Sequence, residues 1–469
     1  MSGKKALAVA DQFFLSKNKT EPSQYKSHTV HYGWVVRPLA KDEGQGLPAK
    51  QLNWQAGARD VESTRGTAPR ATGQEIIDEV LLTVMRAPNT YTREDIVEIS
   101  GHGGIAALKN IFQAVVDLGV RPAEPGEFTK RAFLNGRIDL AQAEAVLDII
   151  QAKTDAFLRV SANQLKGDLS LELERIREFL MGTYTEMEAI VNFPEDEIET
   201  PARESFLKNI QMAQVRIDKL LASGQQGKIL REGIKIVLCG KPNVGKSSVL
   251  NALLKQPRAI VSEIAGTTRD TIEETAQIQG IAFQLVDTAG ILEPRDFIEQ
   301  EAVKRSQMFI EQADLLILVI DASEPLSPED VHLLERLKSR RAIIVLNKCD
   351  LGVKVEEGSL KQEFSQPIVR ISALKKIALE ELEKAMVDCV LQGISLDTDA
   401  VLVSNLRHLH SLRECSSALA LAREAMNNVS MEFVCEELKM GIHELDTITG
   451  RNIDQDLLDK IFSEFCIGK

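Results

Sequence analysis

The sequence lacks the features of secreted, membrane-spanning or disulfide-stabilised proteins. No apolar run is long enough to cross a bilayer, and the first residues are not followed by the apolar core of a signal peptide. The six cysteines are scattered and form no C-x-x-C pair, which favours reduced thiols over a disulfide framework or a zinc site. We therefore expect a cytoplasmic protein without a membrane span.

Positive charge is also scarce. The formal net charge is −13 at pH 7, which disfavours broad non-specific binding to nucleic acids but allows a local basic patch. Only a small cluster of Lys130, Arg131 and Arg137 stands out, without a compact basic and aromatic surface around it. The chain has 469 residues, 44% hydrophobic and 27% charged, which is enough for two or three ordinary soluble domains.

A glycine-rich loop between a predicted strand and a predicted helix is the strongest motif. Residues 240–247 read GKPNVGKS, which matches G-x-x-x-x-G-K-[ST], after the apolar run 234–238 and before the helical pattern 248–254. Glycines allow backbone N–H groups to surround phosphates at a helix N-terminus, where the helix dipole favours negative charge. We expect Lys246 to contact the outer phosphates and Ser247 to hold Mg²⁺. The alternative is a glycine-rich turn that matches by chance.

Three later motifs, each following a strand-like apolar run, indicate which nucleotide is bound. In DTAG, Asp287 is suited to hold Mg²⁺ through water and Gly290 to sense the terminal phosphate. In NKCD, the Asp350 carboxylate can accept both hydrogens of the guanine N1/N2 edge, which adenine does not offer. The third motif, SAL at 372–374, is suited to closing over the base. The sequence therefore predicts a guanine-nucleotide domain, and the predicted GTP-binding residues are Asn243, Val244, Gly245, Lys246, Ser247, Ser248, Thr267, Thr268, Asp287, Thr288, Ala289, Gly290, Asn347, Lys348, Asp350, Ser372 and Ala373.

The residue that positions the attacking water is not the usual one. Ile291 stands where a Ras-like switch has its water-orienting Gln, and an apolar side chain cannot orient water. Glu299 is our candidate for this role. From the residues alone, a solvated helix glutamate is the simpler interpretation of Glu299.

The phosphate loop also contains a candidate cation ligand. The Asn243 amide oxygen could coordinate a monovalent cation near the phosphates and so supply positive charge; the alternative is a merely tolerated loop residue. The polar, glycine-containing stretch 262–270 is typical of a mobile switch. Thr267 or Thr268 within it would sense Mg²⁺ and the γ-phosphate.

The first part of the chain has the pattern of a mixed α+β domain. A short helix is expected at 2–17, strands at 29–36, 76–85 and 94–99, and an amphipathic helix at 108–118. Residues from about 39 to 75 are rich in Gly, Pro, Ala, Arg and Asp without a sustained period. This stretch is predicted to be disordered or inserted into the fold.

The hydrophobic period becomes helical from Ile138 onward, except within the nucleotide domain. Helices are expected at 171–190 and 206–221 before that domain and at 401–427, 431–445 and 457–465 after it. The predicted fold class is a multidomain α/β and α protein. A Ras-like P-loop G domain is inserted into an α-helical domain and preceded by an α+β domain. The predicted boundaries are 1–135, 136–227, 228–392 and 393–469.

Four stretches resemble the MnmE (TrmE) family of tRNA-modifying GTPases: residues 124–140, 87–92, 264–270 and the tail 465–469. The resemblance implies a potassium-dependent GTPase whose G domains dimerise across their switch faces. It implies action with an FAD-containing partner, MnmG, in a heterotetramer that adds a (carboxymethyl)aminomethyl group to C5 of the tRNA wobble uridine. The one-carbon unit would come from 5,10-methylene- or 5-formyl-tetrahydrofolate in the N-terminal domain, and the amine from glycine or ammonium.

The resemblance also implies roles for single residues. Asn243 becomes the K⁺ ligand together with Ser262, Ile264 and Thr267, Thr268 joins Ser247 on Mg²⁺, and Glu299 becomes the residue that orients water. The positions that match folate contacts are Glu98, Arg137 and Lys469. Cys466 matches a tail cysteine proposed for the modification chemistry; a thiol that packs a helix end is the alternative.

The sequence departs from the family pattern near its start. The strand–glycine turn–strand unit expected before Ser2 is absent, and the stretch from about 39 to 75 looks inserted. Both changes fall in the folate-binding domain, so we expect intact GTP chemistry with weaker folate binding and N-terminal dimerisation. Two other classes stay open: a ribosome-assembly GTPase, and a paralogue that hydrolyses GTP but modifies no tRNA. The first usually lacks the tail 466–469 and the flanking helices.

Overall fold

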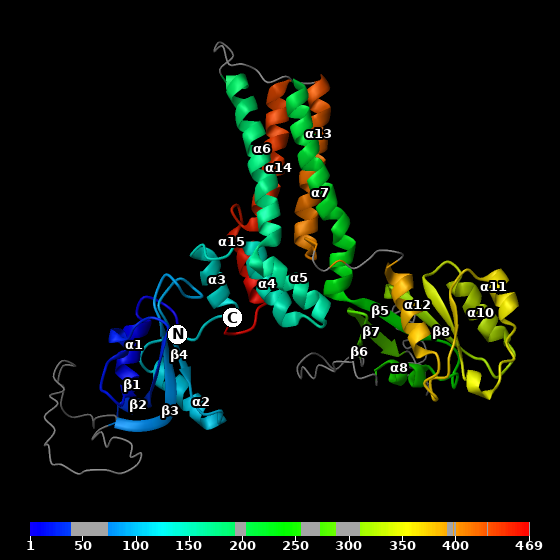
Figure 1. Cartoon of the computed structure of the whole chain (residues 1–469), viewed down its shortest axis with the longest axis horizontal. Helices are drawn as coiled ribbons and strands as arrows, with labels where there is room; N and C mark the ends of the chain where they lie inside the picture. The colour runs from blue at the N-terminus through cyan, green and yellow to red at the C-terminus, as the bar shows by residue number, and fades with distance from the viewer. Residues whose placement is uncertain are drawn as a thin grey trace, which may run out of the picture. The chain divides into compact units, whose positions relative to one another are not determined.

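The computed structural model describes residues 1–38, 74–192, 203–254, 273–287, 310–391, 397, 400–428 and 430–468 (Figure 1). Most of the predicted insertion at about 39–75 lies outside these residues; its last two, Gln74 and Glu75, begin strand β3. The chain forms two compact units, one made of Met1–Ile138 with Asp454–Lys469 and the other of Asp139–Ile453.

The first unit is built on an antiparallel sheet of order β1-β2-β3-β4. Its strands are β1 (Phe14–Ser16), β2 (Thr29–Pro38), β3 (Gln74–Met85) and β4 (Ile96–Ser100). Its helices are α1 (Ala6–Phe13), the short 3-10 helix η1 (Pro22–Gln24), α2 (Ile105–Val116), α3 (Glu127–Leu134) and α15 (Gln455–Ser463).

The core of this unit lies between the sheet and helices α1 and α2. Side chains that alternate along β3, Val80, Leu82 and Val84, are buried with residues of both helices, because successive strand residues point to opposite faces. The helix expected at 2–17 was too long, because α1 spans only Ala6–Phe13. It ends at Phe13, and Phe14–Ser16 pair with β2 instead, because Phe14 and Ser16 are buried at alternate positions.

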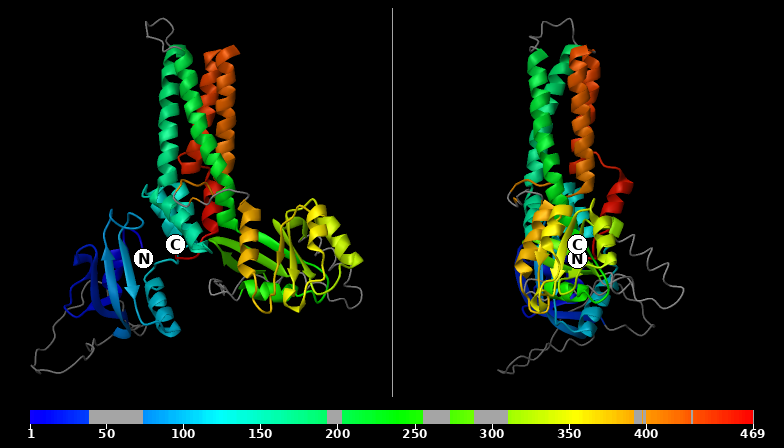
Figure 2. Two further views of the ribbon diagram at one scale, coloured as in Figure 1. Left: turned by 45° about the vertical axis from the view of Figure 1, so that its right-hand side comes forward. Right: turned by 90° about the vertical axis from the view of Figure 1, so that its right-hand side faces the viewer.

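The second unit contains an α-helical bundle. Its helices are α4 (Leu140–Gln151), α5 (Asp155–Lys166), α6 (Asp168–Asn192), α7 (Arg203–Glu232), α13 (Leu406–Asn428) and α14 (Met431–Thr449). The long helices α6, α7, α13 and α14 run alongside one another in both figures and enclose one apolar core (Figures 1 and 2). The predicted helix at 401–427 started too early, because 401–405 are not helical and α13 begins at Leu406.

The same unit contains a six-stranded sheet of order β10-β9-β8-β5-β7-β6, parallel except for the pair β6 and β7. Its strands are β5 (Ile234–Cys239), β6 (Glu273–Ile278), β7 (Ile281–Asp287), β8 (Leu315–Asp321), β9 (Ala342–Asn347) and β10 (Ile368–Arg370). The accompanying helices are α8 (Lys246–Leu254), α10 (Pro328–Leu337), the 3-10 helix η3 (Cys349–Leu351), α11 (Glu357–Glu363) and α12 (Leu379–Leu391).

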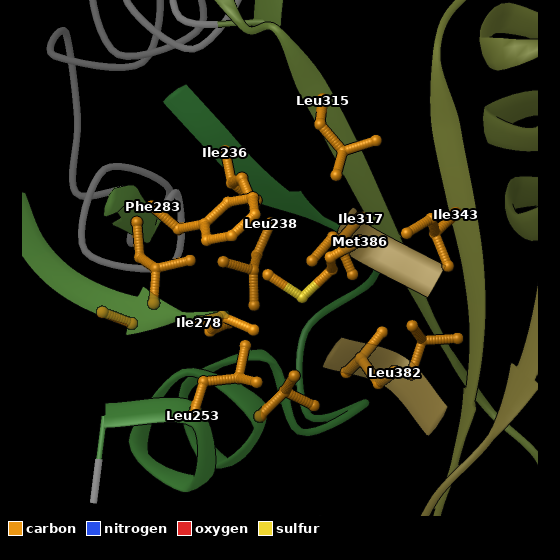
Figure 3. Close-up of a cluster of buried hydrophobic side chains, with 14 of the residues drawn as sticks. Ile236, Leu238, Leu253, Ile278, Phe283, Leu315, Ile317, Ile343, Leu382 and Met386 are labelled. Carbon is orange, nitrogen blue, oxygen red and sulfur yellow. The ribbon is translucent and has the colours of Figure 1, made fainter. Parts of the chain in front are cut away.

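Both faces of this sheet are covered. Ile236 and Leu238 of β5 pack with side chains of α8 and α12, where Leu253, Leu382 and Met386 point toward one another (Figure 3). Alternate residues of the same strands pack with α10 and α11 on the other face. Burial on both faces explains the continuous apolar strands. Parallel strands covered on both faces, with one antiparallel edge strand, form the predicted Ras-like arrangement. The predicted fold class is confirmed.

Among the described residues, no helix is long and apolar enough to cross a membrane.

Candidate functional site

The phosphate loop joins β5 to α8, and its backbone requires glycine at two places. Gly240 and Gly245 have φ of +140° and +98°, where a side chain is strained. A Cβ would lie 2.3 Å from the Val319 carbonyl oxygen at position 240 and 2.3 Å from Asn347 Nδ2 at position 245. Neither neighbour is a flexible chain end, because one is backbone and the other is fixed by its own hydrogen bonds. The loop therefore follows its tight path only with these glycines.

Lys246 begins α8, and its ammonium group folds back over the loop. Its side chain is buried, and Nζ donates to the carbonyl oxygens of Gly240, at 3.0 Å, and Lys241, at 2.8 Å. Ser247 follows it in the first turn, where backbone N–H groups have no partner within the helix. A lysine and a helix N-terminus together favour a bound anion.

The loop is braced by the last residue of β9, Asn347, and by Lys348, which follows it. The buried Asn347 donates from Nδ2 to the Val244 carbonyl at 2.9 Å, and its Oδ1 accepts from the Ala373 N–H at 3.1 Å. Lys348 Nζ donates to the Asn243 carbonyl at 2.8 Å and pairs with Asp321 Oδ2 at 2.6 Å. One dipeptide thus connects the phosphate loop, the end of β8 and the segment after β10.

The residues that the sequence assigned to the base lie next to this dipeptide. Asp350 is exposed and belongs to η3, and the preceding Cys349 donates its N–H to the Ile371 carbonyl at 3.1 Å. Ser372 is buried, and its Oγ accepts from the Lys375 N–H at 3.2 Å. The exposed carboxylate of Asp350 is therefore available to a ligand, while the segment at 372–373 is fixed beside it.

Two acidic residues of the site were missed by the sequence reasoning. Asp321 ends β8; burial acts to raise its pKa, but hydrogen bonds from Lys348 and Ser323 hold that pKa below its usual value. Asp330 of α10 accepts from Lys241 Nζ at 2.8 Å, and this bond raises the pKa of Lys241. The signal for β8 was present in the sequence, since the apolar run at 315–320 ends in an Asp as β7 does.

A separate cavity of about 870 Å³ lies in the first unit, between β4, α2, α3 and the tail. Glu98 lines it, together with the tail residues Ile467 and Gly468. Glu127 lies at its wall, where hydrogen bonds from Arg121, at 2.6 and 2.8 Å, are the main cause that lowers the pKa of Glu127 to about 2. The cavity thus combines apolar walls with fixed charges.

The other residues assigned to folate and to the tail chemistry are placed differently. Arg137 lines a second pocket of about 470 Å³, where its guanidinium lies 4.6 Å from the centre of the Tyr91 ring. It does not line the cavity of Glu98. The Cys466 thiol is exposed, and its backbone carbonyl accepts from the Gly126 N–H at 3.3 Å. The next residue, Ile467, pairs with Pro125 in an isolated β-bridge.

Comparison with known families accounts for both units. Residues 1–137 match the family model described as the GTP-binding protein TrmE N-terminus, and residues 140–466 match the model described as the MnmE helical domain. The second match alone covers more than half of the chain. The chain belongs to the MnmE (TrmE) family.

Relatives match over almost their whole length. A protein named tRNA modification GTPase MnmE from Alkaliphilus oremlandii is 40% identical over 471 residues, which cover 100% of this chain and 95% of the relative. The protein of the same name from Natranaerobius thermophilus is 45% identical over 396 residues, covering 84% and 86%. The one from Bacillus licheniformis is 40% identical over 472 residues, covering 100% and 96%. The recognition of the MnmE family and the assignment as a GTPase are confirmed.

Only part of the predicted MnmE site lies within the described residues. The structure brings Asn243 and Val244 of the loop together with Asn347, Lys348 and Ala373. Asp287 is the last residue of β7. Nine predicted site residues lie outside the described part of the chain: Ser262, Ile264, Thr267, Thr268, Thr288, Ala289, Gly290, Glu299 and Lys469.

Proposed function

We propose that this chain is a potassium-dependent GTP hydrolase that adds a (carboxymethyl)aminomethyl group to C5 of the tRNA wobble uridine. It does so as a homodimer in the cytoplasm, together with an FAD-containing partner of the MnmG type. The main support is the braced phosphate loop. Asn347 and Lys348 hold the carbonyls of Val244 and Asn243, so the base-side motif and the phosphate-side motif form one site.

The residues present fit GTP with Mg²⁺. Lys246 and the first turn of α8 would stabilise charge on the phosphates, and Asp350 would accept the two guanine hydrogens. Ser247 would hold Mg²⁺, which neutralises phosphate charge when bound. Among the described residues no group of three His, Cys, Asp or Glu side chains could hold a metal. The proposed Mg²⁺ site needs no such group, because the Ser247 hydroxyl, phosphate oxygens, water and Thr268 would complete the coordination.

The proposed K⁺ site rests on Asn243. This residue is exposed in the left-handed conformation, with φ of +62°, and Lys348 fixes its backbone carbonyl. Its amide oxygen is a ligand suited to hard cations, and we propose that it coordinates K⁺ at this loop. The further ligands proposed are Ser262, Ile264 and Thr267, with Glu299 as the residue that orients the attacking water.

The cavity of the first unit fits a tetrahydrofolate. It is about 870 Å³, within the usual size of small-molecule pockets, and has apolar walls with a few charged groups. Glu98 and the tail would hold a 5-formyl- or 5,10-methylene-tetrahydrofolate, which would supply the one-carbon unit when bound. Lys469 follows the lining residue Gly468 and is proposed to join them, while Arg137 would contribute from its own pocket. Cys466 is proposed to take part in the tRNA chemistry.

Nucleoside analysis of tRNA tests this function. The full chain is incubated with the FAD-containing partner, GTP, Mg²⁺, K⁺, a tetrahydrofolate, glycine and tRNA that lacks the modification. We expect the modified wobble uridine with the wild type and with Lys384→Ala, an exposed residue of α12, but none with Lys246→Ala. GTP hydrolysis without any modified uridine would contradict the proposal and favour a GTPase of another role.

A further inference from the structure

The bundle has a groove between α13 and α14 that none of the proposed steps uses. The groove has a volume of about 350 Å³, and its apolar floor is formed by Leu421 and Met440 with the buried Ala418. Leu421 and Met440 are large apolar side chains that are 52% and 57% exposed. Large apolar side chains in a concave surface are typical of an interaction site.

The apolar surface continues on the other side of α13. A second hollow of about 810 Å³ lies between α13 and α7 and shares Ser417 and Leu421 with the groove. Leu207 of α7 also lines this hollow. Leu421 therefore lines two neighbouring hollows, and a partner that covers it would bury apolar surface in both.

The lining residues form two rows between which a third helix would fit. On α13 the groove is lined at positions 414, 417 and 421, and on α14 at 437, 440 and 444. Residues separated by three or four positions share one helix face, so each helix contributes a straight row about two turns long. Two turns span about 11 Å. Such a trough accepts the apolar face of a third helix, as in helix-in-groove recognition.

The charge around the groove selects the partner. Four glutamates line it, against a single lysine, and the lining glutamates are Glu414, Glu436, Glu437 and Glu444. The lysine, Lys439, lies 3.8 Å from Glu436 in an exposed pair that contributes little. This potential repels the phosphates of RNA and attracts Lys or Arg side chains.

One of these carboxylates has an oxygen atom that accepts no hydrogen bond from the described residues. Glu437 Oε2 is buried and has no hydrogen-bond partner among the described residues. A buried acceptor without a partner is unfavourable, and an incoming ammonium or guanidinium group would satisfy it. The apolar floor, the helical spacing and this carboxylate therefore favour the same ligand.

We propose that the groove between α13 and α14 docks a basic amphipathic helix of a partner protein. Its apolar face covers Leu421 and Met440, and its Lys or Arg residues pair with the glutamates of the rim. The proposal does not depend on the tRNA chemistry, because the groove lies on the bundle and contains none of the proposed nucleotide or folate ligands.

A model peptide tests the groove. The probe is a helical peptide of about 18 residues with Leu on one face and Lys on the other, and the matched control has Glu in place of Lys. Binding to the full chain is measured by titration, and the bound region by hydrogen exchange. We expect only the Lys peptide to bind, with protection at 414–421 and 436–444 and an affinity that falls with added salt.

Two variants of the groove and one control complete the test. Glu436→Gln/Glu437→Gln/Glu444→Gln and Leu421→Ala/Met440→Ala should each weaken peptide binding at least about tenfold. Glu178→Gln/Glu186→Gln, exposed on α6, should bind like the wild type, and all three variants should keep the wild-type GTP hydrolysis rate. Equal binding of the Lys and Glu peptides, unchanged binding by both groove variants, or protection elsewhere on the chain would overturn the proposal.

Discussion

At the scale of single residues, the nucleotide site depends on polar side chains with two partners each. Asn347 connects Val244 to Ala373, and Lys348 connects Asn243 to Asp321. These bonds use the side chains of the NKCD motif to hold the phosphate loop, the end of β8 and the segment after β10 in place. Asp350 differs, because its carboxylate is exposed. Base specificity should therefore depend on this one residue.

Replacing Asp350 with Asn should exchange the nucleotide preference. An amide offers one acceptor and one donor group in place of two acceptors, so it no longer matches guanine but matches xanthine, which has a carbonyl at C2. We expect Asp350→Asn to weaken GTP binding by about 100-fold or more and to gain XTP binding. Titration with fluorescent GTP and XTP analogues measures both. Unchanged GTP affinity would show that Asp350 does not contact the base.

The sequence predicted this site only in part. The loop and the NKCD motif were evident because each ends an apolar strand, and their residues do lie together. The pairing of Lys241 with Asp330 could not be predicted, since it joins residues far apart in the chain and depends on how α10 packs on the sheet. The placement of Arg137 and Glu98 in different pockets could not be predicted either. A match to a family motif identifies residues but does not say how far apart they lie.

At the scale of elements, α7 packs closely on the segment that enters α13. Gly224 and Gly227 are about one turn apart on α7; Gly224 faces α13 itself, and Gly227 faces the segment that enters it. A Cβ at Gly227 would lie 2.2 Å from the Val403 carbonyl oxygen, and one at Gly224 would lie 2.4 Å from Leu409 Cδ2. The helix predictions found the two elements but not this contact, because hydrophobic periodicity indicates which face is buried and not how closely two backbones approach.

Replacing Gly by Ala inside a helix usually raises stability. At these two positions the replacement should instead lower the stability of the bundle. Gly227→Ala is expected to destabilise the bundle by about 1–3 kcal/mol, because a backbone carbonyl must move. Gly182→Ala in α6 is the matched control, since a Cβ there meets no atom within 4 Å. The control should stabilise the bundle by up to about 1 kcal/mol. Urea unfolding measures both changes; a Gly227→Ala variant as stable as the control would contradict the packing described.

At the scale of the whole molecule, one helical bundle is assembled from chain segments on both sides of the G domain. Helices α6 and α7 precede β5, and α13 and α14 follow α12, yet all four share one core. The change of hydrophobic period along the sequence predicted this interruption. The inclusion of α15 in the first unit was not foreseen, because an amphipathic pattern does not identify which surface the helix packs against. The predicted domain boundaries stay predictions.

If Asn243 holds a K⁺ ion at the phosphate loop, as proposed, GTP hydrolysis will depend on the monovalent cation in solution. GTP hydrolysis by the full chain is compared in KCl and NaCl of equal concentration, for the wild type, for Asn243→Ala and for Asn251→Ala, an exposed residue of α8. We predict several-fold faster hydrolysis in KCl for the wild type and Asn251→Ala, and loss of this stimulation in Asn243→Ala, because the amide oxygen is the proposed K⁺ ligand. Equal wild-type rates in the two salts would contradict a K⁺ site at Asn243.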